Sequence, residues 1–197
     1  MPEAVRSTLI YLSLIFLVVG GYHRIRAAQS QEKIDRTREG WPILISLRMA
    51  GLGTFGTAAA WLWNPSWFEW AAIAMPEWAR WVGVGCFAIT IAWLAWMFVT
   101  LGRNLTDTVV TREAAKFVSH GPYRYVRNPM YLGILMVGLS LGLALGTWLL
   151  PLGSITTFSI LAMRTSTEEK YLLAKFGDRY RDYMRQVGRF FPRLTAH

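Results

Sequence analysis

The long apolar stretches of this chain lack acidic residues. No Asp or Glu occurs within residues 7–22, 41–63, 78–101 or 130–163, and the last of these also lacks Lys, Arg and His. Ion pumps and proton relays place acidic groups near the middle of the membrane. We therefore do not expect a pump or a cation transporter.

Cysteine and histidine are also scarce. The single Cys86 excludes an intramolecular disulfide, and we expect a buried, inert thiol there. The histidines have no Cys or carboxylate partner at metal-ligand spacing, so we assign no metal site. They are His23, His120 and His197.

Apolar residues make up 53% of the 197 residues, with ten tryptophans among them. This composition is typical of a polytopic membrane protein. The run 130–163 is too long for one span of about 20 residues, and Gly146 and Pro151 near its middle indicate a tight helical hairpin. We therefore predict a single all-α domain, 1–197, with five transmembrane helices. Their expected ranges are about 7–22, 41–63, 78–101, 130–146 and 148–163.

The basic residues predict the orientation. Segments 23–40, 102–129 and 164–197 hold 18 of the 21 Lys and Arg residues, whereas loop 64–77 has none. The positive-inside rule places the three basic segments in the cytoplasm, with the N-terminus outside and the C-terminus inside. Tryptophans near the opposite surface fit an aromatic belt. Because the net charge of +9 is spread over membrane loops, we expect lipid headgroups as its partners, not nucleic acid.

The first span is the weakest prediction. Residues 7–22 would extend only about 24 Å as a helix, and a cleaved signal peptide is the competing interpretation. We favour an uncleaved span, because Arg24 and Arg26 follow directly and would hinder translocation. Within later spans, snorkelling is one interpretation of Arg48 and Arg80. Arg48 could equally bind a lipid phosphate or a substrate carboxylate.

Polar residues gather in Lys116–Tyr131, read KFVSHGPYRYVRNPMY. Gly121-Pro122 predicts a turn, and Pro129 suits the first turn of the next helix. The N–H groups at that helix start could bind an anion. A ligand is the best reason for so polar a segment beside a membrane.

A second polar segment begins after the last span. Arg164 and Glu168 are four residues apart and share a helical face. Alternatively, Thr165 caps a new helix with Glu168 three residues on, and Glu169 is simply solvated. Gly177 then ends the helix, and Asp178 caps a final one in which Tyr180 and Tyr183 pack at the membrane surface. The hairpin between the two polar segments brings them together.

These segments resemble the isoprenylcysteine carboxyl methyltransferase and phospholipid methyltransferase superfamily. The resemblance rests on LGRN (101–104), KFVSHGPYRYVRNPMYLG (116–133), RTSTEE (164–169) and FGDRYRDYMRQVGRFFP (176–192). It implies an all-helical membrane enzyme that uses S-adenosylmethionine, bound by segments 101–131 and 164–192, with a lipid-like substrate entering from the bilayer.

Carried over by position, the resemblance implies a set of site residues. The cofactor-binding residues are Lys116, Val118, Tyr123, Asn128, Pro129, Tyr131 and Glu169. The residues facing the reacting group are Arg127, Arg164 and Glu168. This chain has Asn128 where the family often has His; an amide keeps a hydrogen-bonding role but cannot become cationic.

The methyl acceptor stays open at this point. A prenylcysteine-type carboxylate would be ionised without a base and oriented by Arg127 or Arg164. A phospholipid amine would need a base, for which Glu168 is the candidate, and a small thiol is a third acceptor. Alternatives of other classes are a nicotinamide-dependent membrane reductase and a non-catalytic membrane scaffold.

Overall fold

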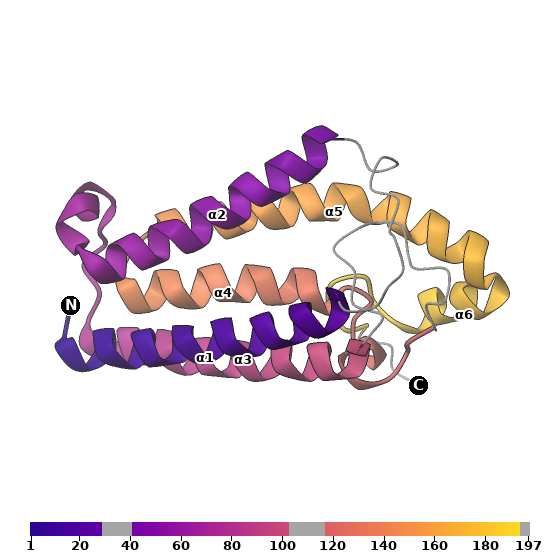
Figure 1. Cartoon of the computed structure of the whole chain (residues 1–197), viewed down its shortest axis with the longest axis horizontal. Coiled ribbons are helices and arrows are strands. Elements are labelled where there is room, and N and C mark those ends of the chain that lie inside the picture. Colours follow the sequence, from indigo (N-terminus) through magenta and orange to yellow (C-terminus); the bar gives the residue numbers. More distant parts are fainter. Residues whose placement is uncertain (29–40, 103–116, 194–197) are drawn as a thin grey trace.

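The computed structural model describes residues 1–28, 41–102 and 117–193, with the backbone alone for 41–44, 46–48 and 50. Every regular element in this part is a helix. Five long helices, α1 to α5, run side by side along the molecule (Figure 1). A tryptophan-rich end carries the short η2, and the opposite end, the polar end, carries η4 and α6. In chain order the elements are α1 (Glu3–Ala28), α2 (Trp41–Trp63), η2 (Pro65–Ala71), α3 (Glu77–Leu101), η4 (Gly121–Arg124), α4 (Pro129–Leu145), α5 (Leu149–Phe176) and α6 (Asp178–Gln186).

Helix α1 is longer than expected. It covers 26 residues, Glu3–Ala28, and so extends about 39 Å. The helix continues beyond the predicted span 7–22 at both ends, through charged residues that hydropathy excludes from a span. Near the helix start, Arg6 Nε donates to the Leu62 carbonyl at the end of α2 over 2.8 Å. This contact joins the first two helices at the tryptophan-rich end.

Two described helices are long and apolar enough to cross a membrane. They are Glu3–Arg26, with mean hydropathy 1.8, and Glu77–Leu101, with mean hydropathy 2.1; Pro129–Leu145 is apolar but shorter. Helix α1 exposes large apolar side chains such as Leu17 (63%) and Val18 (70%). Exposed apolar side chains on a helix of this hydropathy suit contact with lipid or another protein. The prediction of an all-helical fold is confirmed for the described residues, and α1 and α3 are candidate membrane spans.

The predicted hairpin of α4 and α5 is present. Gly146 ends α4 with φ +71°, in the left-handed region that favours glycine. A Cβ there would also meet the Arg80 guanidinium at 2.8 Å. Arg80 Nη1 donates to the carbonyls of Ala144 (3.1 Å) and Leu145 (2.7 Å). The snorkelling interpretation of Arg80 is therefore wrong: its charge stabilises the C-terminal end of α4. The side chain of Arg48 lies outside the described residues.

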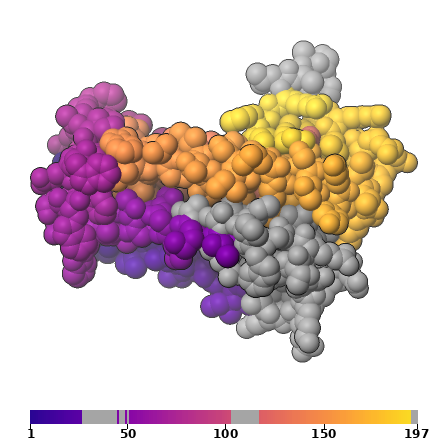
Figure 2. Space-filling view, turned by 90° about the horizontal axis from the view of Figure 1, so that it is seen from above, coloured from indigo at the N-terminus to yellow at the C-terminus, as the bar shows by residue number. Residues whose placement is uncertain are grey.

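Helix α5 runs without a break from Leu149 to Phe176, along one side of the molecule (Figure 2). The alternative interpretation, in which Thr165 caps a new helix, is wrong because α5 continues through Thr165. The Thr165 hydroxyl donates to the Leu161 carbonyl one turn earlier (2.9 Å), which is how a threonine satisfies its hydroxyl inside a helix. Asp178 is likewise not a cap; it lies in the first turn of α6 and pairs with Arg181. The extended α5 carries its polar residues beyond the apolar bundle.

Candidate functional site

The segment before α4 folds into a turn, as predicted. Gly121 has φ +62° and opens the short η4 helix, in which Pro122 occupies the first turn. A Cβ at Gly121 would lie 2.4 Å from the Thr100 hydroxyl of α3. The turn therefore packs directly against the end of α3. Val118 and Tyr123 lie half-buried on either side of this turn.

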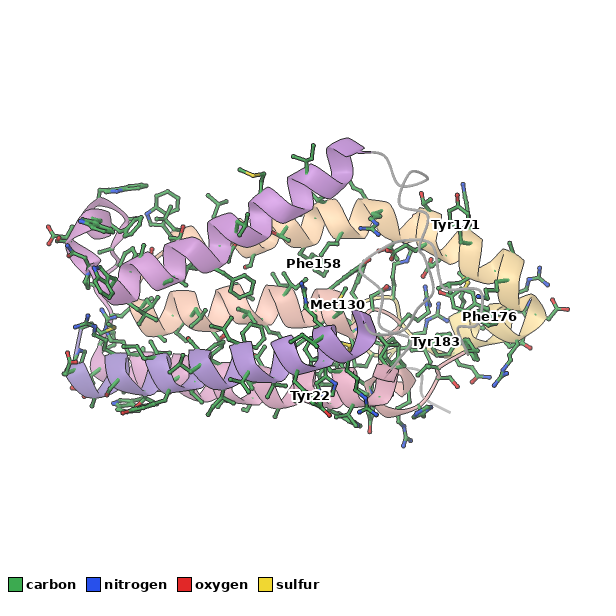
Figure 3. All side chains as sticks on the ribbon, viewed as in Figure 1. Tyr22, Met130, Phe158, Tyr171, Phe176 and Tyr183 are labelled. Atoms are coloured by element: carbon green, nitrogen blue, oxygen red, sulfur yellow. The ribbon has the colours of Figure 1, made fainter. Side chains whose placement is uncertain are left out.

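Aromatic packing fixes this segment to α6. The Phe117 ring contacts the rings of Tyr183 (5.3 Å between centroids) and Phe176 (5.5 Å). Tyr183 also donates its hydroxyl to the Tyr123 carbonyl at 2.6 Å. Burial raises the pKa of Tyr183, so the hydroxyl stays protonated and able to donate. Figure 3 shows Phe176 and Tyr183 at the corner between α5 and α6.

This packing corrects the expectation for the two tyrosines of α6. Tyr180 and Tyr183 do share a helical face, but both are buried against protein. The ring that covers both tyrosines belongs to Phe117, which lies about 60 residues earlier in the chain. Their partner could not be read from local spacing.

Arg127 and Glu169 form a buried ion pair across the polar end. Arg127 Nη2 lies 2.8 Å from Glu169 Oε1, and the two side chains are 7% and 6% exposed. Arg127 Nε donates to the same oxygen at 2.9 Å. Its Nη1 donates to the carbonyls of Met184 (3.0 Å) and Val187 (2.5 Å) at the end of α6. One guanidinium therefore ties the start of α4 to both α5 and α6.

Tyr131, Arg164 and Glu168 form the second polar group. The Tyr131 hydroxyl lies 2.6 Å from Glu168 Oε1 and 2.7 Å from Oε2. Arg164 Nε lies 3.3 Å from Glu168 Oε1, one turn earlier on α5. The shared helical face of Arg164 and Glu168 is confirmed. The two polar segments are also brought together, as the hairpin predicted.

The pKa of the Glu168 carboxyl is set by opposing effects. Burial raises the pKa of its carboxyl, and the charge of neighbouring Glu169 adds to that rise. The Tyr131 hydrogen bond and the Arg164 charge act against it. Since burial is the largest effect, the net pKa lies above the ordinary value of 4.5.

Asn128 and Pro129 occupy the start of α4. The Asn128 side-chain amide donates to the Arg189 carbonyl (3.0 Å), as does its backbone N–H (3.1 Å). The Pro129 carbonyl accepts from the Trp93 indole of α3 at 3.0 Å. Pro129 lies in the first turn of α4, as predicted. Asn128 makes no side-chain cap to that helix, and its NH₂ group donates to the C-terminal segment.

The structure thus gathers most of the predicted residues at one end. Arg127, Asn128 and Tyr131 meet α5 or the C-terminal segment, whereas Lys116 lies outside the described residues. Arg189 was not among the predicted site residues, yet its Nη2 lies 2.5 Å from Glu169 Oε2. Only its place in the motif FGDRYRDYMRQVGRFFP pointed to it. In the described part of the chain, no group of three or more His, Cys, Asp or Glu could hold a metal ion.

The chemistry of this arrangement follows from its charges. Three guanidinium groups meet two carboxylates in a largely buried cluster, whose members are Arg127, Arg164, Arg189, Glu168 and Glu169. The excess positive charge favours an anionic ligand group, and the carboxylates can accept from an ammonium or a hydroxyl. The cluster lies directly beyond an apolar bundle.

The chain is similar in sequence to a known protein family and to named methyltransferases. The family model described as phospholipid methyltransferase matches residues 78–179. Protein-S-isoprenylcysteine O-methyltransferase of Schizosaccharomyces pombe is 36% identical over 110 residues, which cover 48% of this chain and 47% of the relative. Methanethiol S-methyltransferase of Mycobacterium tuberculosis is 29% identical over 136 residues, which cover 69% of this chain and 50% of the relative.

A solved structure shares the fold. The eukaryotic intramembrane Ras methyltransferase ICMT (isoprenylcysteine carboxyl methyltransferase) aligns with a TM-score of 0.54 and 21% sequence identity. The alignment covers 81% of this chain and 54% of that chain. The chain spans about half the length of the relatives named above.

Proposed function

The chain belongs to the phospholipid methyltransferase family, and we propose that it transfers a methyl group from S-adenosylmethionine to a lipid-like or amphiphilic acceptor. The acceptor group in this proposal is a carboxylate of the prenylcysteine type. The observation that carries it is the buried cluster at the polar end, where three guanidiniums outnumber two carboxylates.

The polar cluster suits the methyl donor chemically. S-adenosylmethionine carries a cationic sulfonium and ammonium, a carboxylate and a ribose diol, and it supplies an electrophilic methyl group when bound. Glu168 and Glu169 suit its cationic groups or its diol, and the start of α4 suits its carboxylate. In this proposal the donor is held by residues from both polar segments. They are Lys116, Val118, Tyr123, Asn128, Pro129, Tyr131 and Glu169.

The acceptor would be held by the arginines. A carboxylate with a pKa near 3.5 is ionised at neutral pH and needs no base. Arg164 is 6% exposed, so its charge acts with little screening by water, and with Arg127 it would orient the carboxylate oxygens. Alignment and exclusion of water would then supply most of the acceleration.

A thiol acceptor is the second candidate, since the alignment with methanethiol S-methyltransferase of Mycobacterium tuberculosis covers 69% of this chain. A phospholipid amine is the third, and in both cases Glu168, with its raised pKa, is the candidate base. The family match favours methyl transfer over the two remaining alternatives, a nicotinamide-dependent reductase and a non-catalytic scaffold.

The site would lie at the cytoplasmic surface. Helix α1 begins at the end of the bundle opposite the end that carries α6 (Figure 1), an arrangement that suits five spans. The basic helix α6 lies at the polar end, which the positive-inside rule places in the cytoplasm. The N-terminus would then lie outside, and the acceptor would reach the cluster from the bilayer.

The test is methyl transfer by the purified protein in lipid nanodiscs. Methyl-labelled S-adenosylmethionine is supplied with one acceptor at a time: a prenylcysteine, its carboxamide, phosphatidylethanolamine or methanethiol. We expect labelling of the free carboxylate and none of the carboxamide. Replacement of Tyr131 by Phe should reduce it, while Tyr125→Phe, at an exposed tyrosine, serves as the matched control. Labelling of the amine or the thiol alone would contradict the proposed carboxylate acceptor. Absence of S-adenosylmethionine binding would contradict the proposed donor.

A further inference from the structure

The C-terminal strap, defined here as residues 187–192, runs beside the residues that lead into α4. Val126 and Gly188 form a parallel backbone bridge. The Arg127 N–H donates to the Gly188 carbonyl at 2.9 Å. The strap is thus paired by its backbone with the segment that carries Arg127 and Asn128. It lies at the polar end, beyond the residues 78–179 that the family model matches.

Arg189 contacts both halves of the polar cluster. Its carbonyl accepts from the backbone N–H and the side-chain amide of Asn128, at 3.1 and 3.0 Å. Its guanidinium lies 2.5 Å from Glu169 Oε2. A single residue of the strap therefore connects the start of α4 to the last third of α5.

We infer that Arg189 is a positioning residue of the methyl-transfer site, an inference that rests on the proposed function. It sets the orientation of the Asn128 amide and of the second Glu169 oxygen. The carbonyl of Arg189 is an acceptor only, so the Asn128 group beside it must be the donor NH₂. The amide oxygen is then directed to the other side. The Arg189 guanidinium likewise restricts the position of Glu169 Oε2, to which it donates.

Stability alone does not account for the Arg189 side chain. Arg127 already neutralises Glu169 from the buried side, with both side chains under 10% exposed. The Arg189 side chain is 40% exposed, and ion pairs this open contribute at most about 1 kcal/mol. What the second guanidinium adds is geometry. It contacts Glu169 Oε2, whereas the ion pair and hydrogen bond of Arg127 are to Oε1.

An apolar contact holds the other side of the strap. The Phe190 ring packs edge-on against Phe158 of α5, with centroids 5.0 Å apart. Phe158 lies on the α5 side that faces α4 (Figure 3). It precedes Glu169 by eleven residues, which returns it to nearly the same helical face. The strap is thereby anchored to α5 at two points, one apolar and one charged.

The experiment compares Arg189→Met and Arg189→Lys with Arg185→Met, an exposed arginine on α6. We expect Arg189→Met to lower kcat about tenfold or more, because a displacement of 1 Å can reduce a rate roughly a hundredfold. Arg189→Lys should retain part of the activity, and dilute guanidinium, far below denaturing concentrations, should partly restore Arg189→Met. Arg185→Met should match the wild type.

A second measurement needs no ligand. Hydrogen exchange at the backbone amides of Arg127 and Asn128 should accelerate in Arg189→Met, with exchange at Ile73 of the tryptophan-rich end unchanged. Unchanged exchange together with wild-type kcat and KM would overturn the inference. So would tighter donor binding by Arg189→Met, which would make the guanidinium a competitor of the donor. Failure of the wild type to bind the donor would overturn the proposed function instead.

Discussion

The hydroxyl of Tyr131 contacts both carboxylate oxygens of Glu168, at 2.6 and 2.7 Å. Tyr131 is the third residue of α4, whereas Glu168 lies deep in α5. The hairpin must therefore align the start of one helix with a point far along the next. The hydrogen bond lowers the pKa of Glu168 against the effect of burial. This contact thus links the fold of the hairpin to the charge of the site.

Replacing Tyr131 by Phe should reduce both activity and stability. The ring is retained while the carboxylate loses its donor, and hydrogen bonds to charged groups contribute about 1.5–3 kcal/mol. Methyl transfer and thermal unfolding in detergent would measure the two effects. Tyr125→Phe, at a tyrosine that is 43% exposed, should change neither. Equal kcat/KM for Tyr131→Phe and the wild type would contradict a role for this contact.

Glu168 should make stability depend on pH. Its pKa is raised in the folded protein, so the folded state binds the proton more tightly than the unfolded state. The resulting stabilisation is complete below the ordinary pKa of 4.5 and is lost as the pH rises through the raised value. The wild type should therefore lose stability relative to Glu168→Gln over that range. Unfolding both proteins at a series of pH values tests this. The prediction would be contradicted if the unfolding free energy of the wild type minus that of Glu168→Gln stayed constant or increased with pH.

The Arg127–Glu169 pair should be strongly coupled. Removing one partner of a buried ion pair leaves the other charge uncompensated and costs about 3–5 kcal/mol. We expect Arg127→Met and Glu169→Gln each to destabilise the protein by an amount of this order, and the double variant to lose much less than the sum. A double-mutant cycle by thermal unfolding measures the coupling. The exposed pair Arg181–Asp178 is the control, with an expected coupling below about 1 kcal/mol. Additive losses at Arg127 and Glu169 would contradict the prediction.

The sequence predicted those features that depend on nearby residues. The turn at Gly121 and the hairpin at Gly146 follow from backbone conformations that favour glycine. The shared face of Arg164 and Glu168 follows from helical periodicity. These local rules are sufficient to predict that the two polar segments meet.

The remaining features depend on contacts between distant residues. Arg80 binds carbonyls about 64 residues away in the chain, which hydropathy alone cannot reveal. Thr165 fits a capping box, yet α5 continues through it and its side chain is buried. The same limit applies to Arg189, whose partners Asn128 and Glu169 come from different helices. Local propensity is overridden wherever tertiary contacts supply more stabilisation.

Asn128 should tolerate His but not Asp. The family often has His at this position, and an imidazole N–H could still donate to the Arg189 carbonyl. An Asp carboxylate has no hydrogen to donate and would face that carbonyl oxygen. We expect Asn128→His to keep its affinity for S-adenosylmethionine within a few-fold, and Asn128→Asp to lose about tenfold or more, as for an unpaired buried polar group. Calorimetric titration in detergent distinguishes the two, and loss of binding in Asn128→His would show that the site requires the amide.

Arg80 should affect stability without affecting catalysis. Its guanidinium caps the end of α4 at Ala144 and Leu145, at the end of the bundle opposite the polar cluster (Figure 1). Charged caps in partly buried positions contribute up to about 2 kcal/mol. We expect Arg80→Met to lower the unfolding temperature while the kcat and KM of the folded protein stay at wild-type values. Arg181→Met, which removes an exposed arginine of α6, should leave both properties unchanged. A fall in kcat for Arg80→Met below its unfolding transition would mean that the two ends of the bundle are coupled through α4.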